Sequence, residues 1–123
     1  FYAPAPDSFG AASGITIAAA DDLGFTISHT WASGECVTSG TGRVTCKSAD
    51  KNFQGKFGPF TATPNVFRFN VTFKKQAIDS TRVFVGPVKV RLIYNGAPVA
   101  GIDRVGTIID CKAIGSGLSC RNF

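Results

Sequence analysis

The chain has 123 residues, with 13 Lys and Arg against 8 Asp and Glu, which gives a net charge of +5. Charged residues make up 17% of the chain and apolar residues 44%, a balance too hydrophobic for a disordered protein. The longest uncharged apolar runs are far shorter than the roughly 18 residues that a membrane-spanning helix needs. We therefore expect one compact, soluble domain with no membrane insertion.

The beginning of the chain predicts an extended arm. Residues 1–13 contain Pro4, Pro6 and several Ala, which favour extended backbone over a helix or a strand. No linker interrupts residues 14–123, which are expected to fold as a single β domain. The first residue, Phe1, and the absence of Met indicate a processed chain.

Alternation of polar and apolar residues begins at residue 14, as in strands that have one buried face. Residues 14–18 and 25–31 are expected to pair as a hairpin, because turn-forming residues lie between them. We assign His29 to the polar face of the second strand, opposite Phe25 and Ile27, as a surface histidine.

Residues 52–60 carry three phenylalanines, Phe53, Phe57 and Phe60, among Gly and Pro, without periodicity. Such a stretch either fills the end of the core or stands in a loop as a recognition surface. Core filling is the default interpretation, and the recognition surface is the alternative.

The clearest strand patterns lie at residues 66–74 and 88–94. Each alternates apolar side chains with polar ones, and the polar sides carry the cations Arg68, Lys74, Lys89 and Arg91. If both strands belong to one sheet, these cations form a basic outer face that attracts acidic polysaccharide, anionic lipid or nucleic acid. The alternative is an ordinary solvated face.

The connections around these strands carry weaker signals. Asn95 and Gly96 are typical of a two-residue hairpin turn, with a partner strand from about Val99 toward Ile108. Residues 76–81 could form a short helical turn, and no longer segment shows helical periodicity.

Four cysteines form two similar segments that enclose Gly and Ser. Three pairings are open, and loop closure favours the two short loops, Cys36 with Cys46 and Cys111 with Cys120. A zinc site is disfavoured by the spacings and by the presence of a single histidine. The fold is therefore predicted to be all-β, an antiparallel sandwich or barrel with two disulfide-pinned hairpins.

No catalytic, metal or cofactor site is predicted. In length, in its two disulfides and in its basic sheet the chain resembles the small basic secreted ribonucleases, a resemblance that implies a Glu or His base, a His acid and an Arg. This chain offers Glu35, His29 and several Arg, but no second histidine. Phosphate-binding loops are missing too, because residues 10–14 lack the Lys-Ser/Thr ending of a P-loop. The enzyme stays an alternative, and a cationic antimicrobial or glycan-binding protein is another.

Secretion is expected from the disulfides and from Asn70, the candidate glycosylation site in an Asn-Val-Thr sequence. The processed start, the two short disulfide hairpins, Asn70 and the all-β pattern together resemble small secreted proteins of filamentous fungi, a class that includes apoplastic effectors and elicitors of the plant hypersensitive response. The resemblance implies an extracellular, non-enzymatic virulence or elicitor protein. Its partner would be a host cell-surface protein or glycan, not a nucleic acid, and it would act as a monomer.

Overall fold

The computed structural model describes residues 1, 9, 14–22, 24, 26–59, 65–76, 88–95, 102–108, 111–114 and 117–121, with only the backbone described for residues 102–108, 113 and 114. Ten strands form two antiparallel sheets in this part of the chain. The four-stranded sheet has the order β2-β1-β7-β8, with β1 at Ile15–Ala20, β2 at Thr26–Trp31, β7 at Val88–Tyr94 and β8 at Ile102–Ile108.

The six-stranded sheet has the order β3-β4-β5-β6-β10-β9. Its strands are β3 at Cys36–Thr38, β4 at Val44–Lys47, β5 at Phe53–Pro59, β6 at Phe67–Phe73, β9 at Cys111–Ile114 and β10 at Gly117–Arg121. A short 3₁₀ turn, η1 at Ser33–Glu35, leads from β2 in one sheet to β3 in the other. Within the residues described, no helix could cross a membrane.

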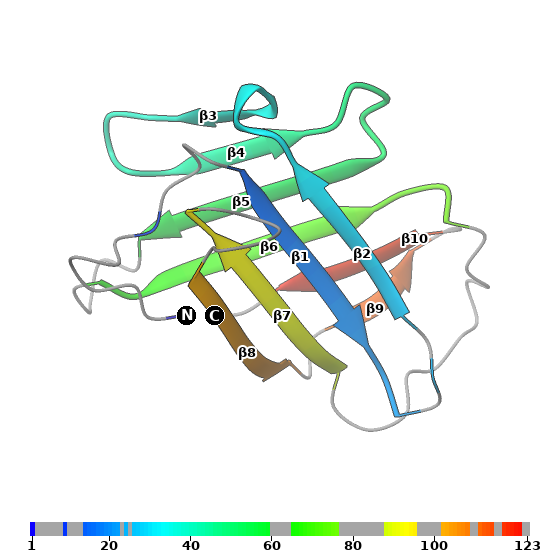
Figure 1. The fold of residues 1–123 in the computed structure, drawn as a ribbon. Coiled ribbons are helices and arrows are strands. Elements are labelled where there is room, and N and C mark those ends of the chain that lie inside the picture. The colour runs from blue at the N-terminus through cyan, green and yellow to red at the C-terminus, as the bar shows by residue number, and fades with distance from the viewer. Residues whose placement is uncertain are drawn as a thin grey trace.

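The two sheets face each other and their strands cross at a steep angle (Figure 1). Among the described strands, none of one sheet pairs with a strand of the other, so the architecture is a sandwich and not a closed barrel. The all-β prediction with two disulfide-pinned hairpins is confirmed.

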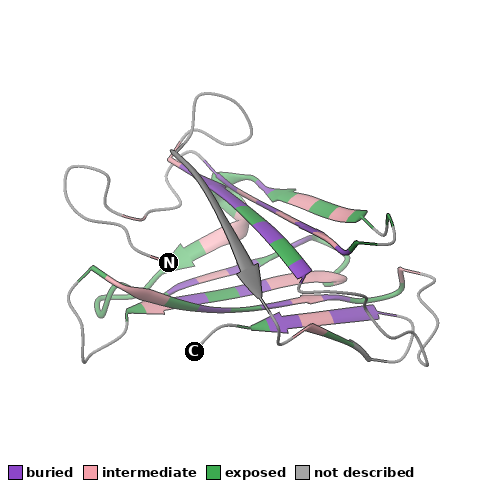
Figure 2. Ribbon diagram, turned by 90° about the horizontal axis from the view of Figure 1, so that it is seen from below, coloured by how far each residue is buried: buried purple, intermediate pink, exposed green. Residues whose placement is uncertain are grey.

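The core lies between the sheets and follows from the alternation of the strands (Figure 2). In β6, Phe69, Val71 and Phe73 are buried while Arg68 and Asn70 are exposed. The same alternation buries every second residue of β1 and of the first part of β7. Because side chains of a strand point to opposite faces in turn, each sheet has one apolar face, and the two apolar faces pack together.

The predicted hairpins are present with changed details. Strand β1 pairs with β2 and extends to Ala20, two residues beyond the predicted end. Strand β7 pairs with β8 as expected, but β8 begins at Ile102, opposite Tyr94, and not near Val99. Gly96, the second residue of the predicted turn, lies outside the described residues. The predicted helical turn lies almost entirely outside the described residues.

The segment at residues 52–60 differs most from expectation, because Phe53–Pro59 form strand β5 and not an irregular segment. The inner face of β5 carries Phe53, Gly55 and Phe57, which alternate as in any strand. Gly55 hides this alternation in the sequence. It is required there, because a Cβ atom at this position would lie 2.9 Å from the ring of Trp31 and 2.9 Å from the ring of Phe57.

The predicted arm contributes two aromatic rings to the sandwich. Phe1 and Phe9 are half-buried, and their ring centroids are 5.0 Å apart. Phe1 also stacks on Phe67 with centroids 5.4 Å apart, and Phe9 meets Tyr94 at 5.2 Å. The nitrogen of Phe67 donates to the carbonyl oxygen of Phe1 over 2.8 Å. This end of the core is therefore filled by aromatics from before the first strand.

Candidate functional site

The four cations predicted to share a surface lie on two different sheets. Arg68 and Lys74 belong to β6 and its end, in the six-stranded sheet, whereas Lys89 and Arg91 belong to β7, in the four-stranded sheet. The predicted basic face required both strands to belong to one sheet, and they do not. Since the outer faces of a sandwich point away from each other, these residues cannot form one binding surface.

The outer face of the six-stranded sheet instead gathers cations from five of its strands. We call this surface the basic face. It comprises Arg43, Lys47, Lys56, Arg68, Lys74, Lys112 and Arg121, all exposed. Two of them were predicted as surface residues, and the strand pairing adds the other five.

Strand register explains why these side chains meet. Asn70 of β6 lies directly opposite Lys56 of β5 on one side and Arg121 of β10 on the other. Gly58 of β5 lies opposite Arg68. A Cβ atom added to Gly58 would lie 3.5 Å from the Nε atom of Arg43. Residues that face each other across antiparallel strands project from the same side of the sheet, so these form two neighbouring rows.

A further row completes the basic face. Lys47 pairs with Gln54, Gln54 with Thr72, Thr72 with Ser119 and Ser119 with Lys112. The cations thus stand at both ends of this row, with amide and hydroxyl side chains between them.

Acidic side chains are not found on the outward strand positions that the structure describes in this sheet. The acids whose side chains the structure describes are Asp21, Asp22, Glu35 and Asp50, which lie in loops or in η1. Asp103, of which only the backbone is described, belongs to β8 in the other sheet. The basic face therefore carries charge of one sign, which raises the local potential and attracts anions over a distance set by the ionic strength.

A depression of about 280 Å³ lies within the basic face. The side chains of Arg43, Lys56, Arg68 and Arg121 surround it, with Asn70 and Gly58 among its lining. Gly58 has no side chain, which leaves room between the two rows. Asn70, the candidate glycosylation site, is exposed here, so a glycan attached to it would cover the depression.

The three phenylalanines considered as a recognition surface do not form one in the part of the chain that the structure describes. Phe57 is fully buried and Phe53 is half-buried, so both serve the core, as the default interpretation expected. Phe60 lies outside the described residues.

Lys89 and Arg91 line a separate depression of about 420 Å³ with Ala18, Ala20 and Ser28 of β1 and β2.

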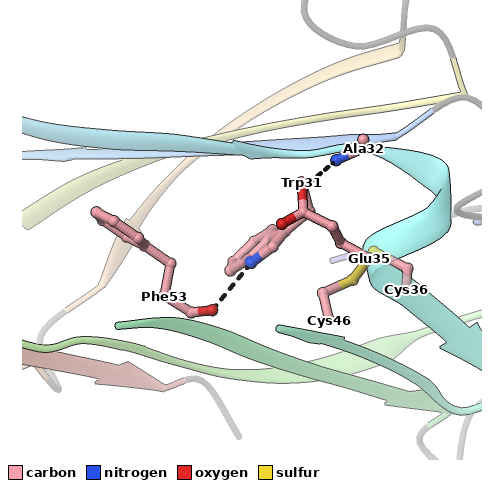
Figure 3. The surroundings of a disulfide bond; sticks show 6 residues. All are labelled: Trp31, Ala32, Glu35, Cys36, Cys46 and Phe53. Carbon is pink, nitrogen blue, oxygen red and sulfur yellow. Dashed lines mark hydrogen bonds between the residues drawn. A yellow bond between two sulfur atoms is a disulfide. The ribbon is translucent and has the colours of Figure 1, made fainter. Parts of the chain in front are cut away.

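A second cluster lies between the sheets, around Trp31 (Figure 3). The indole Nε1 donates to the carbonyl oxygen of Phe53 over 3.1 Å, which ties β2 to β5 across the sandwich. Next to it, Glu35 accepts a hydrogen bond from the backbone nitrogen of Ala32 over 3.0 Å, at the start of η1. The disulfide between Cys36 and Cys46 follows directly after η1.

His29 belongs to this cluster, and its predicted place on the polar surface is wrong. It has the same parity as Ile27 and Trp31, and all three point inward from β2. Its ring stacks on Phe53 with centroids 4.0 Å apart and an angle of 4° between the planes. Among the described residues, its Nε2 atom is buried without a hydrogen-bond partner.

Burial lowers the pKa of His29 below its ordinary value of 6.5, while Glu35 and Asp50 raise it by a smaller amount. As the pH falls through 6.5, the unfolded chain therefore takes up a proton before the folded chain does, and the folded state loses stability. We expect a lower melting temperature at pH 5 than at pH 7.5. In His29→Phe, which keeps the ring stack, this difference should shrink; an equal difference in both proteins would contradict the assignment.

Both predicted disulfides are present. Cys36 lies opposite Cys46 and Cys111 lies opposite Cys120, each pair with Cα atoms 4.1 Å apart. Such bonds are typical of proteins from oxidising, extracellular compartments. No cluster of three or more His, Cys, Asp or Glu that could hold a metal ion occurs among the described residues.

No protein-family model, curated protein or solved structure matches the chain. The candidate site therefore depends on its geometry and charge alone.

Proposed function

We propose that the protein is a secreted, non-enzymatic interaction protein of the effector or elicitor type, which binds an anionic partner at a host cell surface through its basic face. The observation that carries this proposal is the segregation of charge. Seven exposed cations lie on one outer face, and none of the described outward strand positions there is acidic. The two disulfides support an extracellular location.

The basic face suits recognition because its backbone is fixed. Each cation lies on or beside a strand whose neighbours are hydrogen-bonded, and the buried residues of the same strands anchor it to the core. Placing the cations in advance lowers the entropic cost of binding a partner. Charge complementarity of this kind acts mainly on the association rate and weakens with salt.

The proposal predicts that leaf tissue infiltrated with the oxidised protein shows a defence response or cell death. Replacing Arg43, Lys56 and Arg68 together by Gln should abolish or strongly reduce this response, because it removes three charges from the basic face. The control is Lys89→Gln with Arg91→Gln, which removes charges from the opposite sheet and should keep the response. An inert wild-type protein with both disulfides intact would contradict the proposal.

A further inference from the structure

We infer that the depression in the basic face is a subsite for the acidic group of a polysaccharide. This inference rests on the proposed function, since it names the partner of the same face. It assigns the recognition to Arg43, Arg68 and Arg121, with Lys56 and Asn70 between them. The other basic-face residues, Lys47, Lys74 and Lys112, would supply only attraction at a distance.

Arginine is the residue type expected at such a subsite. Three of the four cations around the depression are arginines, while the three basic-face cations outside it are lysines. A guanidinium presents planar pairs of N–H donors that match a carboxylate or a sulfate with two parallel hydrogen bonds. It has five donors, so it can hold an anion alongside its other contacts.

The spacing favours a polymer with repeated charges over a single small anion. Neighbouring strands lie roughly 5 Å apart, so Arg43 and Arg68, with Gly58 between them, start about 10 Å from each other. Lys56 and Arg121, with Asn70 between them, are separated in the same way. A chain that carries successive acidic groups could therefore contact both rows.

The side chains between the cations favour a carbohydrate. They are amides and hydroxyls, namely Gln54, Asn70, Thr45, Thr72 and Ser119, which can hydrogen-bond to sugar hydroxyls. The described outward positions of the sheet carry no aromatic ring on which a nucleic-acid base could stack. Among the described residues, the exposed large apolar side chain is Val37, which lies on this face at the edge strand β3, opposite Thr45. A single valine is a small apolar anchor for a membrane or a protein partner.

The test measures binding of polygalacturonate and dextran sulfate by unglycosylated protein from a bacterial host, with neutral dextran as the control polymer. Replacing Arg43, Arg68 and Arg121 by Gln should weaken binding by at least about tenfold, because charge-assisted hydrogen bonds are lost. The matched variant, with Lys47, Lys74 and Lys112 replaced by Gln, removes the same charge and should lose only about two- to threefold.

Two further variants separate a built subsite from a diffuse field of charge. Replacing the three arginines by Lys keeps every charge but removes the paired donors, so binding should still fall several-fold. Gly58→Thr keeps all charges and fills the depression, so polysaccharide binding should fall in this variant as well. Its Cβ atom would lie 3.5 Å from Arg43, an ordinary contact distance, so the fold should be kept. Circular dichroism and the fluorescence of the single Trp verify folding.

Two results would overturn the subsite assignment. One is an equal loss of polysaccharide affinity when the three arginines and when the three lysines are replaced by Gln, and the other is unchanged affinity when the three arginines are replaced by Lys. Binding to anionic phospholipid vesicles or single-stranded DNA without binding to either acidic polysaccharide would also overturn it and would identify the other partner. Preference for polygalacturonate over dextran sulfate assigns a carboxylate, and the reverse preference assigns a sulfate. An unchanged leaf response in a protein that binds no polysaccharide would remove this inference and leave the proposed function standing.

Discussion

Replacing Trp31 by Ala is expected to lower the free energy of unfolding by about 3 to 5 kcal/mol. Trp31 is fully buried and is the largest side chain of the core. Its ring lies over Gly55, at an edge-to-face angle of 80° to Phe57, and its Nε1 atom is bonded to the carbonyl oxygen of Phe53. Alanine would leave a large cavity between the sheets. It would also remove one of the two hydrogen bonds that the carbonyl oxygen of Phe53 accepts, the other coming from the backbone nitrogen of Ser48.

Urea unfolding followed by circular dichroism measures this loss without needing the tryptophan signal. Trp31→Phe keeps most of the apolar contact and removes the hydrogen bond, so its loss should be clearly smaller than that of Trp31→Ala. Ser28→Ala, at an exposed position of the same strand, should change stability by no more than about 0.5 kcal/mol. A loss below about 1 kcal/mol in Trp31→Ala would contradict the placement of the ring.

Removal of both disulfides is the second large effect. Each bond closes a loop of similar length, with sequence separations of 10 and 9, so each should contribute about 2 to 3 kcal/mol by the loop-entropy relation. Small domains have a total stability of roughly 5 to 15 kcal/mol, and a loss of about 5 kcal/mol leaves little of it at the lower end. The reduced protein should therefore unfold at much lower urea concentration.

Paired Cys→Ala variants separate the two bonds. Cys36→Ala with Cys46→Ala should lower the unfolding free energy by about the same amount as Cys111→Ala with Cys120→Ala, because the loops are alike. Urea unfolding with and without a thiol reductant provides the comparison for both bonds together. An unchanged midpoint after complete reduction would show that the cross-links do not stabilise the folded state.

Local patterns predicted the strands that alternate without interruption. In β6 and in the first part of β7 every second residue is large and apolar, so the inner face could be identified before any partner strand was known. The two disulfides were predicted for a similar reason, because short loops close with little loss of entropy. Strand β5 was missed because Gly55 takes the place of an apolar side chain in its pattern.

The position of His29 shows a different kind of error. Its parity with Ile27 and Trp31 is present in the sequence, and it indicates the inner face. The polarity of the imidazole led to the opposite assignment. Stacking on Phe53, a residue 24 positions further along the chain, explains how the ring is accommodated between the sheets.

The basic face required the tertiary structure. The sequence determines that Arg68 and Lys89 each stand on the polar side of a strand, since that depends only on alternation within the strand. Whether those sides coincide depends on which strands pair, and pairing is decided by contacts between residues far apart in the chain. Strand β6 joins β5 and β10, whereas β7 joins β1 and β8, so the cations are divided between opposite faces. The same pairing brings Arg43, Lys56 and Arg121 beside Arg68.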